Sequence, residues 1–146
     1  MKKRFYIIGL LIIIIDQLTK FLLKDKYLTV IPKVLNFTYT ENTGGAFGVG
    51  SRFFILGISI VIIAILIYFM VKEKDRIIDY TPYILIVSGS FGNMIDRIFR
   101  GYVIDFIDIR LFEYPNFNIA DICVVCGVIL LIIEILFFSK KKKIKK

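Results

Sequence analysis

The stretch FFILGISIVIIAILIYFMV, residues 53–71, decides the fold class. It runs for 19 residues without a charged side chain, which is long enough for a helix to cross the hydrocarbon core of a bilayer. The whole chain agrees with this interpretation, because 58% of its 146 residues are hydrophobic and its mean hydropathy is +0.78. Ordinary soluble domains are less apolar. The sequence therefore predicts an integral membrane protein.

Three further apolar segments extend the prediction to four transmembrane helices. They are residues 5–23, 77–95 and 119–138. Residues 77–95 give the weakest signal, because they include Asp79 and Pro82. We include them because an even number of spans puts both chain ends on one side of the membrane, where the basic residues lie.

The basic residues predict the orientation. Twelve of the 20 Lys and Arg residues lie in residues 2–4, 72–76 and 140–146. By the positive-inside rule these segments are cytoplasmic, which leaves residues 24–52 and 96–118 outside. The net charge of +8 is thus explained by membrane orientation, and we expect no nucleic-acid partner.

The two outer segments have strand character. In VLNFTYTEN, Leu35, Phe37 and Tyr39 alternate with polar residues, and this period of two is typical of a strand. Residues 101–112 are also rich in β-branched residues. We expect one domain over residues 1–146, with a small β-cradle built from residues 28–50 and 101–118 at the outer surface.

The absence of histidine narrows the chemistry. Without it the chain has no Ser-His-Asp or Cys-His triad and no HExxH zinc site. Cys123 and Cys126 form a C-x-x-C, but zinc needs further ligands and redox pairs usually lie at helix starts in soluble folds. We interpret them as buried, inert thiols and expect no metal and no cofactor.

Two aspartates are the candidates for chemistry. Asp105 lies among large apolar residues in VIDFI, and Asp121 stands at the head of the last span. The predicted topology brings both to the outer membrane boundary. Two nearby carboxylates share one proton, so the charged one can activate water while the protonated one donates to a carbonyl or leaving amine. Asp121 also has a structural interpretation, since Asn118 three residues earlier suggests a capping box; the two roles are compatible.

Other polar residues leave two interpretations open. Asp16 and Lys20 are four residues apart on one helix face, where they either neutralise each other for insertion or take part in the site. An uncompensated charge at the centre of a span costs about 2.5–3.5 kcal/mol. Residues 92–109 are either a solvated loop with weak ion pairs or part of the site.

Four motifs in order resemble lipoprotein signal peptidase, the bacterial type II signal peptidase. They are DQLTK at 16–20, NTGGAFG at 42–48, GNMIDRIFRGYVIDFIDI at 92–109 and FNIAD at 117–121. The resemblance implies a four-helix intramembrane aspartic peptidase with catalytic residues Asp105 and Asp121. It further implies that Asn42 and Arg97 hold the substrate backbone. The remaining motif positions would support the site: Asp16, Lys20, Gly44, Asn93, Asp96 and Asn118.

The same resemblance implies the reaction and its setting. The enzyme would cleave signal peptides from diacylglyceryl-modified prolipoproteins just before the lipid-modified cysteine. It would act as a monomer in contact with membrane lipid, in the bacterial cytoplasmic membrane, with both termini cytoplasmic and the active site outside. The alternative from a different class is a small ion or proton transporter that uses the intramembrane carboxylates.

Overall fold

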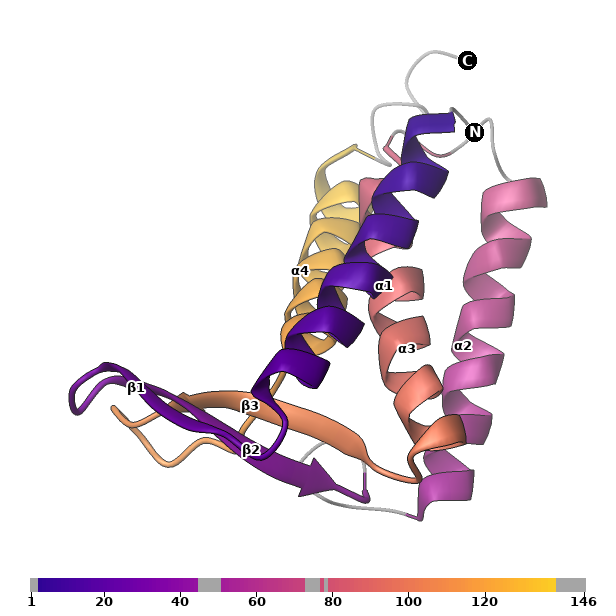
Figure 1. The fold of residues 1–146 in the computed structure, drawn as a ribbon. Helices are drawn as coiled ribbons and strands as arrows, with labels where there is room; N and C mark the ends of the chain where they lie inside the picture. The colour runs from indigo at the N-terminus through magenta and orange to yellow at the C-terminus, as the bar shows by residue number, and fades with distance from the viewer. Residues whose placement is uncertain (1–2, 45–50, 73–76, 78, 139–146) are drawn as a thin grey trace.

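Four long helices lie side by side, and a small sheet projects from one end of them (Figure 1). The computed structural model describes residues 3–44, 51–72, 77 and 79–138. The helices are α1 (Lys3–Leu23), α2 (Arg52–Lys72), α3 (Thr81–Phe99) and α4 (Ile119–Ile133), which continues as the π-helix η2 (Glu134–Phe138). The strands are β1 (Tyr27–Ile31), β2 (Leu35–Asn42) and β3 (Val103–Ile109).

Among the described residues, three helices are long and apolar enough to cross a membrane. They are Lys3–Leu23, Phe53–Lys72 and Ile119–Phe137. The remaining long helix, α3, has a comparable length of 19 residues. It is more polar, because it carries several side chains of the candidate site. It lies in the middle of the bundle, where it contacts α1, α2 and α4.

The third helix begins later than the sequence predicts. Residues 77–95 were expected to be helical, whereas Ile77 and Asp79 lie outside α3, which runs from Thr81 to Phe99. Pro82 stands in the first turn of the helix, where proline is favoured. The Asp79 carboxylate accepts hydrogen bonds from the backbone N and Oγ1 of Thr81, at 3.0 and 2.9 Å. These contacts satisfy a free N–H at the helix start.

The predicted small sheet is confirmed, with three antiparallel strands in the order β1-β2-β3. The register sets Thr40 opposite Asp105, and Asn42 opposite Val103. The sheet is joined to the bundle through β3, whose residues 103–106 are buried. Phe37 and Phe106 pack edge to face, with ring centroids 5.8 Å apart. Residues 45–50 of the expected β-rich segment lie outside the described residues, as do most of the predicted basic flanks.

Glycines on α3 allow α1, α3 and α4 to approach closely at the sheet end. A Cβ at Gly89 would lie 2.4 Å from the carbonyl oxygen of Ala120, and a Cβ at Gly92 would lie 2.6 Å from Asp16 Oδ2. Small residues of this kind are typical of packed membrane helices. The close approach brings a side chain of α1 to the first turn of α4.

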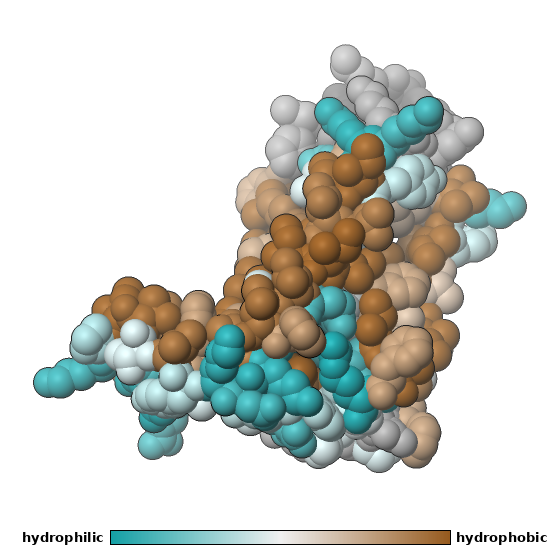
Figure 2. All heavy atoms as spheres, in the orientation of Figure 1, coloured by the Kyte–Doolittle hydropathy of each residue, from teal (hydrophilic) through white to brown (hydrophobic). Residues whose placement is uncertain are grey.

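The outer surface of the bundle is apolar over most of its length. Figure 2 shows hydrophobic side chains covering the helices on this face and hydrophilic ones gathered where the helices meet the sheet. The exposed side chains of α1 include Ile7, Leu11 and Leu18, and those of α2 include Val61 and Ile65. Soluble monomers rarely expose so large an apolar surface, so this surface suits a lipid environment.

Candidate active site

Asp105 and Asp121 come together where the sheet meets the helices, although 16 positions separate them in the sequence. Asp105 lies on β3 and Asp121 in the first turn of α4. Asn118 contacts both: its side-chain Nδ2 donates to Asp105 Oδ1 at 2.6 Å, and its backbone N donates to Asp121 Oδ2 at 3.1 Å. One residue therefore links the two carboxylates.

The start of α4 is a capping box, as the sequence suggested. Asn118 Oδ1 accepts a hydrogen bond from the backbone N of Asp121 at 3.0 Å, while the Asp121 carboxylate accepts from the backbone N of Asn118. This reciprocal pair fixes the side chain of Asp121. Asp121 therefore caps the helix and also lines the cavity described below.

Amide groups donate to every oxygen of the two carboxylates. Asn93 Nδ2 donates to Asp121 Oδ1 at 2.7 Å, and Asn42 Nδ2 donates to Asp105 Oδ2 at 2.9 Å. The other two oxygens accept from Asn118. Asn93 is itself oriented, because its Oδ1 accepts from Lys20 Nζ at 3.0 Å and from Asn118 Nδ2 at 3.1 Å. Both aspartates are thus held in fixed positions before any substrate binds.

A buried ion cluster supports these amides from the side of α1. Lys20 Nζ lies 2.8 Å from Asp16 Oδ2 and 2.9 Å from Asp96 Oδ2, and all three side chains are fully buried. With Asn93 as the third acceptor, the three N–H groups of the ammonium are satisfied. Asp16 and Lys20 therefore neutralise each other, and Lys20 also contacts Asn93, which donates to Asp121.

Asp16 also contacts the helix that carries Asp121. Its Oδ1 accepts a hydrogen bond from the backbone N of Ala120 at 3.0 Å. Ala120 is in the first turn of α4, where backbone N–H groups have no partner within the helix. A side chain of α1 thus helps to position the start of α4, across the gap left by Gly92.

Sequence reasoning did not assign two members of this cluster, Gln17 and Arg100. Gln17 Nε2 donates to Asp96 Oδ1 at 3.0 Å and to the Gly92 carbonyl oxygen at 3.1 Å. Arg100 donates to Asp96 Oδ1 and, at 2.8 Å, to Gln17 Oε1. Two signals were available: a glutamine inside an apolar span, and an arginine four residues after Asp96.

Arg97 joins the cavity wall to the segment after β2. Its Nη2 donates to the Gly44 carbonyl oxygen at 2.9 Å, and its Nη1 to the Asn93 carbonyl oxygen at 3.3 Å. The Nε of Arg97 is buried and has no hydrogen-bond partner within the described part of the chain. Gly44 is held from its other side, since its backbone N donates to Asn42 Oδ1 at 3.0 Å.

The environment of Asp105 favours its protonated form. Burial and then the negative charge of Asp121 raise the pKa of Asp105 to about 6. The hydrogen bonds from Asn42 and Asn118 and the charge of Lys20 act in the opposite direction. Asp105 is only 3% exposed, which explains why burial has the largest effect.

A cavity of about 380 Å³ gives access to the two carboxylates. Its polar wall includes both aspartates together with Asn42, Asn93, Arg97 and Asn116, while Ile55 and Ile62 of α2 line its apolar wall. Every residue that the sequence singled out for the site lies in this cavity wall or in the network behind it. The gathering of these charges at one end of the bundle argues against the transporter alternative, which needs a relay across the membrane.

The C-x-x-C lies apart from this chemistry but is less buried than predicted. Cys123 is half-buried and Cys126 is exposed on α4, and both are free thiols. Within the described ranges, no group of three His, Cys, Asp or Glu residues could hold a metal ion.

Comparison with known proteins identifies relatives over nearly the whole chain. The family model described as signal peptidase (SPase) II matches residues 8–137. A lipoprotein signal peptidase of Staphylococcus carnosus is 38% identical over 160 residues, covering 99% of this chain and 100% of the relative. That of Fusobacterium nucleatum is 35% identical over 145 residues, covering 93% of this chain and 88% of the relative. That of Thermodesulfovibrio yellowstonii is 42% identical over 129 residues, covering 84% and 87%.

Two solved structures of bacterial membrane enzymes share the fold. One superposes with a TM-score of 0.82 at 34% identity, covering 98% of this chain and 92% of the other. The second has a TM-score of 0.79 at 34% identity, covering 92% and 94%.

Proposed function

The chain belongs to the signal peptidase II family, and we propose that it removes signal peptides from prolipoproteins with Asp105 and Asp121 as its catalytic pair. One observation carries the assignment of the pair. Two carboxylates on the consecutive elements β3 and α4 are held by the same residue, Asn118, and line the same cavity. A pair of carboxylates in one cavity, with Asp105 buried and Asp121 half-buried, resembles the pair that aspartic peptidases use to share a proton.

In the proposed mechanism the ionised Asp121 is the general base and the protonated Asp105 is the general acid. Asp121 takes a proton from water as the water oxygen bonds to the scissile carbonyl carbon, and Asp105 gives its proton to the carbonyl oxygen. When the tetrahedral intermediate collapses, Asp121 returns its proton to the leaving nitrogen and Asp105 recovers one from the hydroxyl group. The assignment follows from the environments, since Asp121 stands at the positive end of the α4 dipole and the raised pKa of Asp105 favours a bound proton.

Arg97 and Asn42 are proposed to hold the peptide backbone of the substrate. Arg97 lines the cavity, and its buried Nε, which has no partner in the described part of the chain, is the group proposed to donate to a substrate carbonyl. Asn42 lies at the end of β2 and already donates to Asp105. A backbone carbonyl placed between them would lie next to the general acid.

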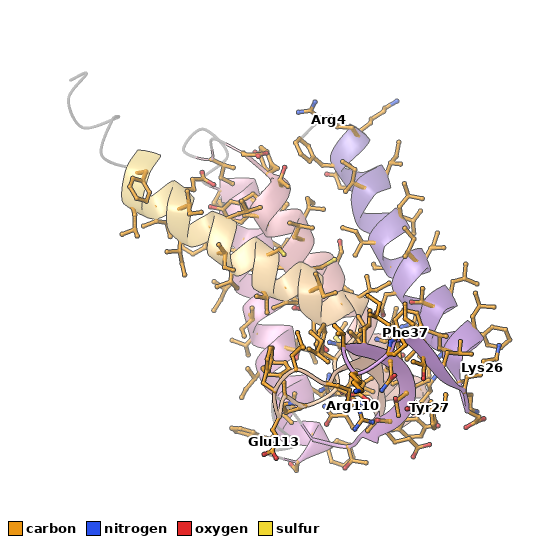
Figure 3. All side chains as sticks on the ribbon, turned by 90° about the vertical axis from the view of Figure 1, so that its left-hand side faces the viewer. Arg4, Lys26, Tyr27, Phe37, Arg110 and Glu113 are labelled. Atoms are coloured by element: carbon orange, nitrogen blue, oxygen red, sulfur yellow. The ribbon has the colours of Figure 1, made fainter. Side chains whose placement is uncertain are left out.

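The substrate class is proposed from the family, and the side of the membrane from the orientation of the chain. We propose that the chain cleaves just before a diacylglyceryl-modified cysteine, at the extracytoplasmic side of the bacterial cytoplasmic membrane. Arg4 lies at the end of α1 opposite Lys26 and the sheet (Figure 3), and the positive-inside rule puts the Arg4 end in the cytoplasm. In this arrangement α3 is the fourth span, and we propose a monomer because both carboxylates and the amides that hold them belong to one chain.

The test is an assay of purified protein in detergent with a diacylglyceryl-modified prolipoprotein and with its unmodified precursor. We expect cleavage of the modified form, with the modified cysteine as the new N-terminal residue by mass spectrometry. Asp105→Asn and Asp121→Asn should each lower kcat by at least about a hundredfold. Because Asp105 must carry its proton, kcat/KM of the wild type should fall as pH rises above about 6.

Asp25→Asn is the matched control. Asp25 is an exposed acid in the turn after α1 with a φ of 57°, a conformation that Asn also adopts readily. This variant should cleave at the wild-type rate. Full cleavage by either active-site variant would overturn the proposed pair, and equal cleavage of the unmodified precursor would overturn the proposed substrate class.

A further inference from the structure

A second cavity of about 320 Å³ opens on the other side of Asp121. Ile122, Val125 and Cys126 of α4 form one wall, and Ile109 at the end of β3 and Phe112 after it form the other. Four residues line both this cavity and the larger one: Tyr114, Phe117, Asp121 and Val125. We call the second cavity the lateral groove.

The two cavities differ in chemistry. The larger cavity presents amide and guanidinium groups, which suit the carbonyl and N–H groups of a peptide. The lateral groove presents hydrocarbon and aromatic side chains, with Asp121 as its charged residue. A ligand of the groove must therefore be apolar and must lie next to the proposed catalytic base.

The lateral groove also faces the surface that suits lipid. Val125 is 55% exposed and Ile122 is 41% exposed, and Ile129 continues the same apolar face along α4. The groove is formed between the start of α4 and residues at the end of β3 and after it. An acyl chain could thus enter from the bilayer without leaving an apolar environment.

We propose that the lateral groove binds the acyl chains of the diacylglyceryl group while the signal peptide occupies the larger cavity. This inference rests on the proposed function, because it takes the substrate to be a diacylglyceryl-modified prolipoprotein. Such a substrate has two apolar parts that diverge at the scissile bond: the signal peptide precedes the bond, and the lipid hangs from the side chain of the cysteine after it. Two cavities that meet at Asp121 match that branched shape.

The first test compares chain lengths in variants that narrow the groove. Ile122→Trp and Cys126→Trp each place a large side chain in the groove, and Cys126 lies more than one helical turn beyond Asp121. Ile129→Trp is the matched control, since Ile129 lies seven residues after Ile122 on the lipid-facing side, outside both cavities. Substrates are synthetic prolipoprotein peptides that carry either dipalmitoylglyceryl or dibutyrylglyceryl.

For the dipalmitoyl substrate, each groove variant should raise KM more than it lowers kcat. Exclusion of about two methylene groups corresponds to a loss of about 10- to 20-fold in kcat/KM. For the dibutyryl substrate the loss in kcat/KM should be markedly smaller. Ile129→Trp should have the wild-type kcat/KM with both substrates. Equal losses on both substrates in both variants would overturn the groove assignment, even where the wild type cleaves normally.

The second test locates the lipid directly. A prolipoprotein peptide with a diazirine in one acyl chain is photo-crosslinked to the wild type, and the site of attachment is found by mass spectrometry. Attachment at Ile109, Phe112, Ile122 or Cys126 supports the inference, and attachment at Ile55 or Ile62 overturns it. Failure of the proposed function has a different signature, since the wild type would then leave the modified peptide uncut.

Discussion

Replacement of Asp105 by asparagine should make the protein progressively more stable relative to the wild type as pH rises towards neutral, although it abolishes the proposed activity. The carboxyl group of Asp105 is 3% exposed, and its pKa is raised from 3.8 to about 6 by burial and by the charge of Asp121. A raised pKa means that the folded protein holds this proton more tightly than the unfolded chain does. The ionised form of Asp105 therefore destabilises the fold, and asparagine removes the ionisation.

The size of the effect follows from the shift in pKa. Each pKa unit corresponds to about 1.36 kcal/mol, so the shift from 3.8 to about 6 corresponds to about 3 kcal/mol at pH values above both. The stabilisation by the proton is complete below the unfolded pKa of 3.8 and is lost as pH rises through the folded pKa of about 6. The stability of Asp105→Asn relative to the wild type should thus increase by about 3 kcal/mol across this window.

The assay is equilibrium unfolding in one detergent, followed by near-ultraviolet circular dichroism of the tyrosines at a series of pH values. The trend with pH is the relevant quantity, because the substitution also places an NH₂ group against Asn42 or Asn118, and the resulting loss of about 1–3 kcal/mol does not depend on pH. Asp25→Asn corrects for the change in net charge. A difference between Asp105→Asn and wild type that stays flat or decreases with pH would refute the reasoning.

Two further predictions concern the packing behind the site. Lys20→Met should lower the free energy of unfolding by about 3–5 kcal/mol, because it leaves buried carboxylates without their cation; Lys20→Met combined with Asp96→Asn should recover part of this loss, and a double variant less stable than the single one would contradict the prediction. Gly89→Ala should cost about 1–3 kcal/mol and lower kcat, because its Cβ would lie 2.4 Å from the Ala120 carbonyl oxygen and push α4 away. Gly57→Ala on α2 is the control for Gly89→Ala, since no atom lies within 4 Å of the Cβ it would add. This control substitution should stabilise the helix by up to about 1 kcal/mol. Equal thermal stability of the two variants would show that the close approach of α3 and α4 is unimportant.

The sequence predicted the features that arise from local patterns. Hydropathy located three helices that can span a membrane, alternation located β2, and the spacing of Asn118 and Asp121 predicted the capping box. Each of these patterns lies within a few residues, so one stretch of chain contains the whole signal. The predicted start of α3 was four residues too early, because the apolar run begins before Pro82. The side chain of Asp79 and the proline set the actual start.

The network around the aspartates could not be derived from local patterns. Asp16 accepts from Ala120, 104 positions away, and Gln17 donates to Asp96, 79 positions away. Their positions depend on the close approach of three helices, which in turn depends on Gly92. Topology predicted that Asp105 and Asp121 lie at similar depth, but the roles of the amides that join them came only from resemblance to a family.

The charges of the cluster explain why one proton belongs in it. The side chains are the carboxylates of Asp16, Asp96, Asp105 and Asp121, and the cations of Lys20, Arg97 and Arg100. With every group ionised, four carboxylates face three cations, and one negative charge stays uncompensated in a largely buried site, which is unfavourable. A proton on Asp105 makes the cluster neutral, in agreement with its raised pKa. Burial and Asp121 raise that pKa, whereas Lys20 lowers it. The balance leaves the pKa of the proposed general acid near neutral pH, where proton transfer is most effective. The lysine that pairs with Asp16 and Asp96 between α1 and α3 therefore also lowers the pKa of Asp105, the proposed general acid.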